Sequence, residues 1–401
     1  MSAGAETPGA QRPVHVAVCT GGRAEYGILR WVIADLERDA RFRLSLLVTG
    51  SHLSEAHGGT VHEIEADGVP IARRIPLELG GVDDPVALLR SVGDASEGVA
   101  RALQALECDA LLVLGDRYEI LGAAQGAFFA GVPIAHVAGG DVTEGAFDES
   151  IRHALTKLAS LHFPTNEESA ARLRRMGEDP ARVHVTGTPA LDHLRRTPRM
   201  TRAELEASLD VELGERNLLV TMHPVTLAQD RGAQQLEALC AALETEPEST
   251  RIVWTGVNQD PGNEAFRAAI DEWVAARPGR VRFVQSLGQA RYFSLMEHVD
   301  AVVGNSSSGI YEAPSFGAWT VDVGDRQGGR LAARSVLRCA PERSAIEAAL
   351  AATRTPPDFE VVSPYGDGHA SERILDALHA HLGTPEARAA LRTKRFHDDG
   401  S

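Results

Sequence analysis

The sequence predicts an α/β protein with two doubly wound domains, each built on a parallel sheet covered by helices. Short apolar segments of strand length alternate with amphipathic segments of helix length along most of the chain. The apolar segments lack a polar residue at every second position, which indicates strands buried on both faces of a parallel sheet. A polar stretch at about 195–216 interrupts the alternation. We therefore expect one domain at 14–196, a second at 215–382 and a tail at 383–401, the two domains facing each other across a cleft.

The first expected strand is 14–19, and a helical pattern over 25–38 follows it. The other strand-like segments of this half lie at 44–49, 110–115, 133–138, 161–164 and 183–187. The second half has the same kind of segment at 217–222, 251–256, 281–285, 300–304 and 319–324. In the charged tail, Pro385 is expected to open a short last helix that frays.

The composition excludes several classes of protein. Of the 401 residues, 43% are hydrophobic and 24% are charged, which excludes a disordered or fibrous chain. The 40 Lys and Arg against 56 Asp and Glu leave a net charge of −16, which argues against nucleic acid or an anionic membrane as a partner. No apolar run reaches the ~18 residues of a membrane-spanning helix.

The four cysteines lie far apart and form no CxxC pair. Neither a disulfide framework nor a cysteine-based zinc site is therefore expected, and a reducing compartment is the default. Residues 1–13 lack the apolar core of a signal peptide and are interpreted as a loose leader. We expect a soluble, cytoplasmic protein.

Distinctive polar and glycine-rich segments follow the expected strands, where open parallel sheets bind their ligands. In the first half these segments are 20–27, 115–119 and 139–141. In the second half they are 222–224, 255–260, 304–309 and 324–330. This placement predicts a binding site built from strand ends.

Two of these segments suit an anion. The turn at Gly21 and Gly22 offers main-chain N–H groups and the guanidinium of Arg23. Ser306 and Ser307 open a helix expected at 307–316, where hydroxyls, free amides and the helix dipole suit a pyrophosphate. Glu312, one turn further on, could accept both hydroxyls of a ribose. The alternative is an ordinary serine N-cap, with Glu312 complementing the helix dipole.

His223 and Arg326 also follow expected strands, and together with Arg23 and Arg117 they could form the local positive cluster that a diphosphate needs. Neither a Walker A loop, a GxGxxG fingerprint, a GxSxG elbow nor an HExxH motif occurs. We therefore expect no metal and no cofactor.

Four carboxylates are candidates for proton transfer. Asp116 follows a buried strand, and partial desolvation there would raise its pKa towards a useful range. Asp141 follows a pair of glycines, and Asp148 and Glu149 come shortly after it. The structural alternatives are an ion pair of Asp116 with an arginine, and a helix-terminal role for Asp148 with Arg152 at i+4.

Several of these strings together resemble the hydrolysing UDP-N-acetylglucosamine 2-epimerases, which start the synthesis of sialic acid and related nonulosonic acids. The first half contributes TGGRAEYG (20–27), GDRYE (115–119) and GGDVTEGAFDESIRH (139–153). The second half contributes MHPVT (222–226), GNSSSG (304–309) and GDRQGGR (324–330). The match runs in order from about residue 14 to 380, and its long central string is the most specific element.

The resemblance implies a GT-B architecture of two Rossmann-like domains, a nucleotide-sugar substrate, no metal and a homo-oligomer, either a dimer or a tetramer. The UDP-contacting positions it implies are Arg23, Arg117, His223, Asn258, Ser306, Ser307, Glu312 and Arg326. The catalytic positions it implies are Asp116, Asp141, His223 and either Asp148 or Glu149. Two positions depart from the family pattern: many relatives have glutamate at the position of Asp141, and threonine is common at that of Gly22.

The reaction that the resemblance implies inverts C2 of a 2-acetamido sugar. Because no carbonyl acidifies the C2 hydrogen, it leaves together with the C1 pyrophosphate in an anti elimination that gives 2-acetamidoglucal and UDP. Water then adds to the glycal and releases N-acetylmannosamine. Three other functions stay open from the sequence: a non-hydrolysing epimerase, a GT-B glycosyltransferase and a nucleotide-sugar sensor. The nucleotide and the other substituents of the sugar stay open as well.

Overall fold

A computed structural model describes residues 12–55, 59–78, 84–143, 147–223, 229–256 and 264–398. The chain divides into two compact units. The first unit comprises the chain up to His193 together with everything from Tyr365 onward, and the second comprises Leu194–Pro364. The loose leader expected at 1–13 lies almost wholly outside the described residues.

The first unit is built on a parallel sheet in the order β3-β2-β1-β4-β5-β6. Its strands are β1 (Val14–Thr20), β2 (Phe42–Thr49), β3 (Ile71–Ile75), β4 (Ala110–Leu114), β5 (Ile134–Val137) and β6 (Leu161–Phe163). Every residue of β1 and β4 is buried, as expected for the centre of a sheet covered on both faces. The strand order reverses between β1 and β4, and such a switch point is where doubly wound sheets bind ligands.

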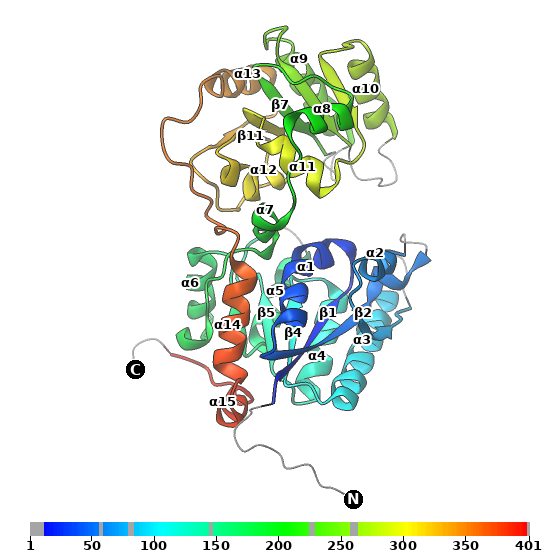
Figure 1. Ribbon diagram of the computed structural model, residues 1–401, viewed down its shortest axis with the longest axis vertical. Coiled ribbons are helices and arrows are strands. Elements are labelled where there is room, and N and C mark those ends of the chain that lie inside the picture. Colours follow the sequence, from blue (N-terminus) through cyan, green and yellow to red (C-terminus); the bar gives the residue numbers. More distant parts are fainter. Residues whose placement is uncertain are drawn as a thin grey trace, which may run out of the picture. The chain divides into compact units, whose positions relative to one another are not determined.

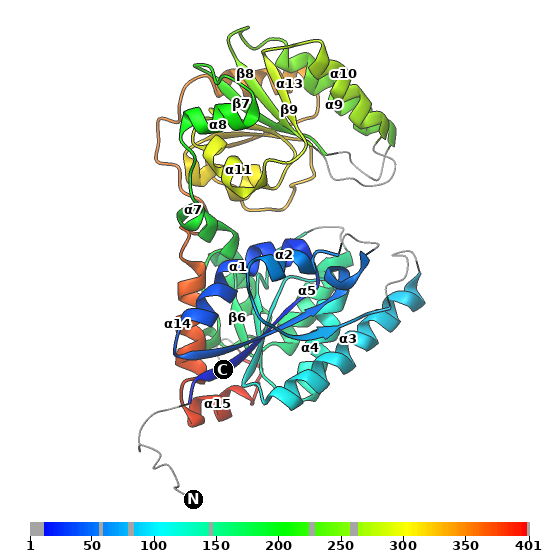
Figure 2. The ribbon, with the colours of Figure 1, turned by 45° about the vertical axis from the view of Figure 1, so that its right-hand side comes forward.

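Helices cover both faces of this sheet (Figure 1). One face packs on α1 (Arg23–Arg38), α2 (Val61–Ala66), α14 (Ala370–Leu382) and α15 (Pro385–Leu391). The other face packs on α3 (Pro85–Leu106), α4 (Tyr118–Phe129) and α5 (Phe147–Leu158). Figure 2 shows α3 and α4 running side by side. The remaining helical segments are α6 (Glu167–Arg175) and the 3-10 turns Gly50–Leu53, Pro180–Arg182 and Pro189–Asp192.

The second unit repeats the same topology, with its sheet in the order β12-β11-β10-β7-β8-β9. Its strands are β7 (Asn217–Thr221), β8 (Arg251–Thr255), β9 (Val281–Val284), β10 (Ala301–Gly304), β11 (Trp319–Val323) and β12 (Val336–Cys339). One face packs on α9 (Gln229–Leu243), α10 (Glu264–Ala275) and α13 (Arg343–Ala352), and the other on α8 (Arg202–Leu209) and α11 (Gly288–Met296). The short helices are α7 (His193–Arg196), α12 (Ser308–Tyr311) and the 3-10 turn Ala313–Phe316. The switch point lies between β7 and β10.

The end of the chain differs from the expected domain division. Helix α14, expected to close the second domain, belongs to the first unit because Ile374 and Leu378 are buried against the core that contains α1. The tail does not fray where the structure describes it: Leu391 of α15 is buried, and Lys394 donates to the carbonyls of Thr156 and Ala159 at 2.8 and 2.5 Å. Pro385 does open α15, as predicted.

Three strand predictions also change. The segment 183–187 is not a strand; it forms only an isolated bridge between Val183 and His162. The sheet-edge strands β3 and β12 were not predicted, because exposure on one side lets them carry polar residues such as Arg73 and Arg338. Within the described ranges, no helix is both long and apolar enough to cross a membrane.

Candidate functional site

In the first unit, the predicted site residues follow the strands on both sides of the switch point. Gly21, Gly22 and Arg23 come after β1, Asp116 and Arg117 after β4, and Asp141 after β5. Asp148 and Glu149 lie in the first turn of α5. These groups therefore lie at the carboxyl edge of the sheet, where the sequence placed them.

Arg152 of α5 links most of the acidic candidates. Its side chain is only 6% exposed, and its guanidinium donates to Asp116 Oδ2 through Nε at 2.8 Å and also through Nη2. Nη1 donates to the Asp141 carbonyl at 2.7 Å and to Glu149 Oε2 at 3.1 Å. Nη2 also donates to Thr143 Oγ1 at 3.1 Å. From the sequence, Arg152 was expected only as a partner of Asp148. In the structure its hydrogen bonds fix the positions of several groups at this edge of the sheet.

Asp141 is held by hydroxyl groups as well as by Arg152. Its Oδ1 accepts hydrogen bonds from Thr165 Oγ1 at 2.9 Å and from Ser169 Oγ at 2.6 Å. These donors lie after β6 and at the start of α6. The carboxylate of this shorter acid is therefore fixed at the carboxyl edge of the sheet.

Asp148 and Glu149 are adjacent but electrostatically different. Asp148 is exposed as a whole residue, but its carboxyl group is partly desolvated. This desolvation is the main cause that raises the pKa of Asp148, and the negative charge of Asp116 raises it further. Burial acts to raise the pKa of Glu149 too, but the Thr143 amide, His153 and Arg152 together hold that pKa below its usual value. The Thr143 amide donates to Glu149 Oε2 at 2.5 Å. Asp148 is thus suited to carry a proton, and Glu149 to stay ionised and fix its neighbours.

Arg23 and Arg117 have different environments. Arg23 is 71% exposed and pairs with Glu63 at 3.0 Å. Arg117 donates through Nε to Glu119 Oε1 at 2.5 Å and lies 3.9 Å from Glu25 Oε1. Glu25 and Glu119 are both buried and were not singled out from the sequence, although they lie inside the strings at 20–27 and 115–119. The sequence offered one signal that could have identified them: each is an acidic residue on the buried face of a helix that starts at the site.

In the second unit, Asn305 joins the predicted residues around the switch point. The His223 amide donates to Asn305 Oδ1 at 2.7 Å, and Asn305 Nδ2 donates back to the His223 carbonyl at 2.8 Å. Arg326 Nη1 and Gln327 Nε2 donate to the Asn305 carbonyl at 3.0 and 2.8 Å. Asn305 and Gln327, each 1% exposed, were missed as supports of this site.

The serine segment opens a shorter helix than the sequence predicted. Helix α12 starts at Ser308 and ends at Tyr311, so it is shorter than the helix expected at 307–316, and a 3-10 turn follows it. Ser307 is its N-cap, but the hydroxyl makes no capping hydrogen bond, so capping does not account for this side chain. Ser306 Oγ lies 3.2 Å from Ser308 Oγ. Asn258 lies outside the described residues.

Glu312 follows α12 and has an unusual carboxyl group. Burial raises its pKa to about 7. Its Oε2 is buried and has no hydrogen-bond partner within the described part of the chain. A buried acceptor of this kind gains most from a ligand that donates a hydroxyl.

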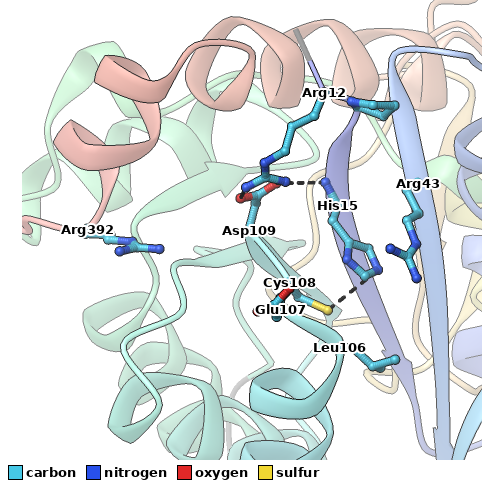
Figure 3. Close-up of a pocket in the computed structure, with 9 residues that line it drawn as sticks. Arg12, His15, Arg43, Leu106, Glu107, Cys108, Asp109 and Arg392 are labelled. Carbon is cyan, nitrogen blue, oxygen red and sulfur yellow. Dashed lines mark hydrogen bonds and ion pairs between the residues drawn. The ribbon is translucent and has the colours of Figure 1, made fainter. Parts of the chain in front are cut away.

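A separate pocket of about 490 Å³ lies at the opposite, amino edge of the first sheet (Figure 3). Arg12 donates two hydrogen bonds to the Asp109 carboxylate, at 2.8 and 2.6 Å, and Asp109 also accepts one from the His15 amide at 2.9 Å. Arg43 and Arg392 line the same pocket. None of the predicted site residues lines it. Among the described residues, no group of three or more His, Cys, Asp or Glu could hold a metal ion.

Comparisons with known proteins show the family of the chain and its fold. A family described as UDP-N-acetylglucosamine 2-epimerase matches residues 34–379. The chain is 33% identical to the UDP-N,N'-diacetylbacillosamine 2-epimerase (hydrolyzing) of Legionella pneumophila, over 90% of this chain and 94% of that one. It is 32% identical to the GDP/UDP-N,N'-diacetylbacillosamine 2-epimerase (hydrolyzing) of Campylobacter jejuni, over 80% and 83%. The crystal structure of the Neisseria meningitidis UDP-GlcNAc 2-epimerase bound to UDP-GlcNAc matches with a TM-score of 0.74 at 19% identity, over 92% of this chain and 100% of that one.

Proposed function

The chain belongs to the UDP-N-acetylglucosamine 2-epimerase family, and we propose that it is a hydrolysing enzyme that releases UDP and the free 2-epimer of a nucleotide-linked 2-acetamido sugar. The observation that carries the hydrolytic part is that both relatives at 32% and 33% identity, which match over 80% or more of the chain, are named as hydrolyzing. Family membership supports the inversion of C2.

Two sugars are candidates for the substrate. The family description favours UDP-N-acetylglucosamine, which would give N-acetylmannosamine. The names of the two relatives favour a second candidate, UDP-N,N'-diacetylbacillosamine, which carries two acetamido groups. Both carry an acetamido group on C2, the carbon that is inverted, so the same chemistry serves either one.

For the nucleotide, we assign Arg326, Ser306, Ser307 and His223 to the diphosphate and Glu312 to the ribose. Arg326 donates to a main-chain carbonyl, and in the described part of the chain no carboxylate forms an ion pair with it. Burial and the nearby Arg330 lower the pKa of Arg326, so an anion there relieves the repulsion between the two guanidinium groups. The unpartnered Oε2 of Glu312 suits a ribose hydroxyl. Arg117, Asn258 and the exposed Arg23 complete the proposed set.

For the sugar, we assign proton transfer to Asp116, Asp141 and Asp148. The charge of Asp116 is matched by Arg152, which suits a carboxylate that removes the C2 proton as UDP leaves. The raised pKa of Asp148 suits the acid that returns a proton to C2 of the glycal when water adds. Asp141, fixed by Thr165 and Ser169, suits assistance at C1. Glu149 is assigned to positioning, because its oxygens are engaged by Thr143, Arg152 and His153.

The test is incubation of the purified protein with each UDP-linked sugar and its GDP counterpart, with no acceptor present, followed by NMR of the products. We expect free nucleotide and a free 2-epimeric sugar from at least one of them. A sugar that is inverted but still linked to UDP would show a non-hydrolysing epimerase. Binding without turnover would show a sensor, and turnover only after an acceptor is added would show a glycosyltransferase.

A further inference from the structure

Beneath the turn at Gly21, two buried carboxylates share one guanidinium. Glu25 of α1 is 6% exposed, and Glu119 of α4 is fully buried. Arg117 donates to Glu119 Oε1 at 2.5 Å and lies 3.9 Å from Glu25 Oε1. Within the described residues, Arg117 is the only cation that forms an ion pair with either of them. Two buried carboxyl groups therefore face one guanidinium, whose own side chain is 48% exposed.

Both carboxylates are also incompletely hydrogen-bonded. Glu25 Oε2 accepts from the Gly21 amide at 2.7 Å, but Glu25 Oε1 and Glu119 Oε2 are buried with no hydrogen-bond partner in the described part of the chain. A buried, ionised oxygen without a donor is costly, and protonation of one carboxyl removes part of that cost. Both the excess of negative charge and the unpaired oxygens therefore favour protonation of one of the two carboxyl groups.

The glycine turn makes room for this arrangement. A Cβ on Gly21 would lie 2.6 Å from Glu119 Cγ and 2.9 Å from Glu119 Oε1. Only glycine at this position lets the Glu119 side chain lie under the turn and reach Arg117. From the sequence, the turn at 20–23 was expected to offer its amides to an anion. In the structure the Gly21 amide donates to Glu25 instead.

We propose that Glu25 and Glu119 share one titratable proton and act as positioning residues for Arg117, so that a nucleoside diphosphate engaging Arg117 makes the pair hold that proton more tightly. The proposal rests on the assignment of Arg117 to the diphosphate. The bond that changes is O–H: when the guanidinium turns to phosphate oxygens, the pair loses its counter-charge and takes up a proton from water or buffer.

The surrounding groups support this coupling. The pKa of Glu25 is raised to about 8, chiefly by burial and next by the charge of Glu119, with a smaller contribution from Asp116. The Gly21 amide and Arg117 act in the opposite direction and lower this pKa. Cys19 of β1 faces the same site, and burial with both carboxylates raises the pKa of its thiol, so it stays neutral. When Arg117 turns away, the pair loses the positive charge that lowers the Glu25 pKa, and its affinity for a proton increases.

The first test needs no ligand. Carbon-13 NMR of glutamate carboxyls should show, in the free protein at pH 7, a protonated carboxyl that titrates near pH 8 and is absent in Glu25→Gln. The Glu312 carboxyl is distinguished by its loss in Glu312→Gln. If every glutamate that titrates above pH 6 persists in Glu25→Gln, the pair does not hold the proton and the proposal is overturned.

The second test measures proton uptake when UDP binds, by calorimetry in two buffers of different ionisation enthalpy. We expect uptake of about half a proton at pH 8 and a larger fraction at pH 9, and we expect it to be lost in Glu25→Gln and in Glu119→Gln. Glu97→Gln is the matched control, since Glu97 pairs with Arg101 at 2.7 Å on the surface of α3. If either buried variant fails to fold, the wild-type protein still gives the uptake.

The outcomes separate the two proposals. UDP binding with no proton uptake from pH 8 to 9 overturns the coupling and leaves the proposed function standing. Uptake that persists in both buried variants overturns the assignment to this pair. Failure of the wild-type protein to bind UDP at all overturns the proposed function, and the ligand-free NMR titration then still decides whether the pair holds a proton.

Discussion

Replacing Arg152 by methionine tests how the carboxylates of the first unit are held. Methionine keeps much of the length of the side chain and removes the guanidinium. The variant leaves Asp116 and Glu149 without the cation that now contacts both, and it leaves the Asp141 carbonyl and the Thr143 hydroxyl without a donor. We expect a large loss of both stability and turnover.

The magnitude follows from burial. Removing one partner of a fully buried ion pair costs about 3–5 kcal/mol. Because the Asp116 and Glu149 side chains are 22% and 25% exposed, water can reach both carboxylates. We therefore expect the lower end, about 3 kcal/mol. For a unit of this size, that corresponds to a fall in melting temperature of roughly 6–12 °C.

The loss should also depend on pH. Arg152 is one of the groups that hold the pKa of Glu149 below its ordinary value of 4.5. A carboxyl with a lowered pKa stabilises the folded state above its unfolded pKa and ceases to do so as pH falls through its folded pKa. The difference between wild type and Arg152→Met should therefore be full at pH 7 and should shrink below about pH 4.5.

Thermal unfolding from pH 4 to pH 8, with turnover measured alongside, provides the assay. Arg101→Met is the matched control, because Arg101 pairs with Glu97 on the surface and should change stability by no more than about 0.5 kcal/mol. A melting temperature for Arg152→Met equal to that of Arg101→Met would refute the account of this cluster.

Three further predictions concern binding and chemistry. Asp116→Asn and Asp141→Asn should bind UDP like the wild type and lose about 10²–10⁴-fold in turnover, and full turnover in both would show that the proton-transfer groups lie elsewhere. In calorimetry, Arg326→Ala should weaken UDP binding by about tenfold or more and Ser307→Ala by less, whereas unchanged affinity in both would remove the loop before α12 from the site. Turnover should be the same in excess EDTA, and a loss that divalent ions restore would contradict this expectation.

Much of the fold could be predicted because the central strands are buried on both faces and carry few polar residues. The edge strand β3 escaped detection because two of its five residues, Arg73 and Arg74, are charged and exposed. The segment that forms helix α14 was assigned to the other domain. Its amphipathic pattern shows that one face is buried, while only the packing of Ile374 and Leu378 shows against which sheet.

The candidate site was predicted in part for a similar reason. Asp116 and Asp141 come within a few residues of the ends of buried strands, so their place at the sheet edge could be predicted from local sequence. Arg152 and Asn305 were missed as supports, because their partners lie far along the chain: Asp116 is 36 residues from Arg152, and His223 is 82 from Asn305. Such contacts depend on the tertiary fold and leave no periodic signal in the sequence.

The most direct test of the central claim is the reaction in D₂O with the sugar that the substrate panel identifies. If a carboxylate removes the C2 proton and a glycal is then hydrated, the free sugar should carry deuterium at C2. NMR of the isolated sugar measures this directly. Product sugar that is inverted at C2 but retains its original hydrogen there would contradict the elimination and hydration route, and with it the roles assigned to Asp116 and Asp148.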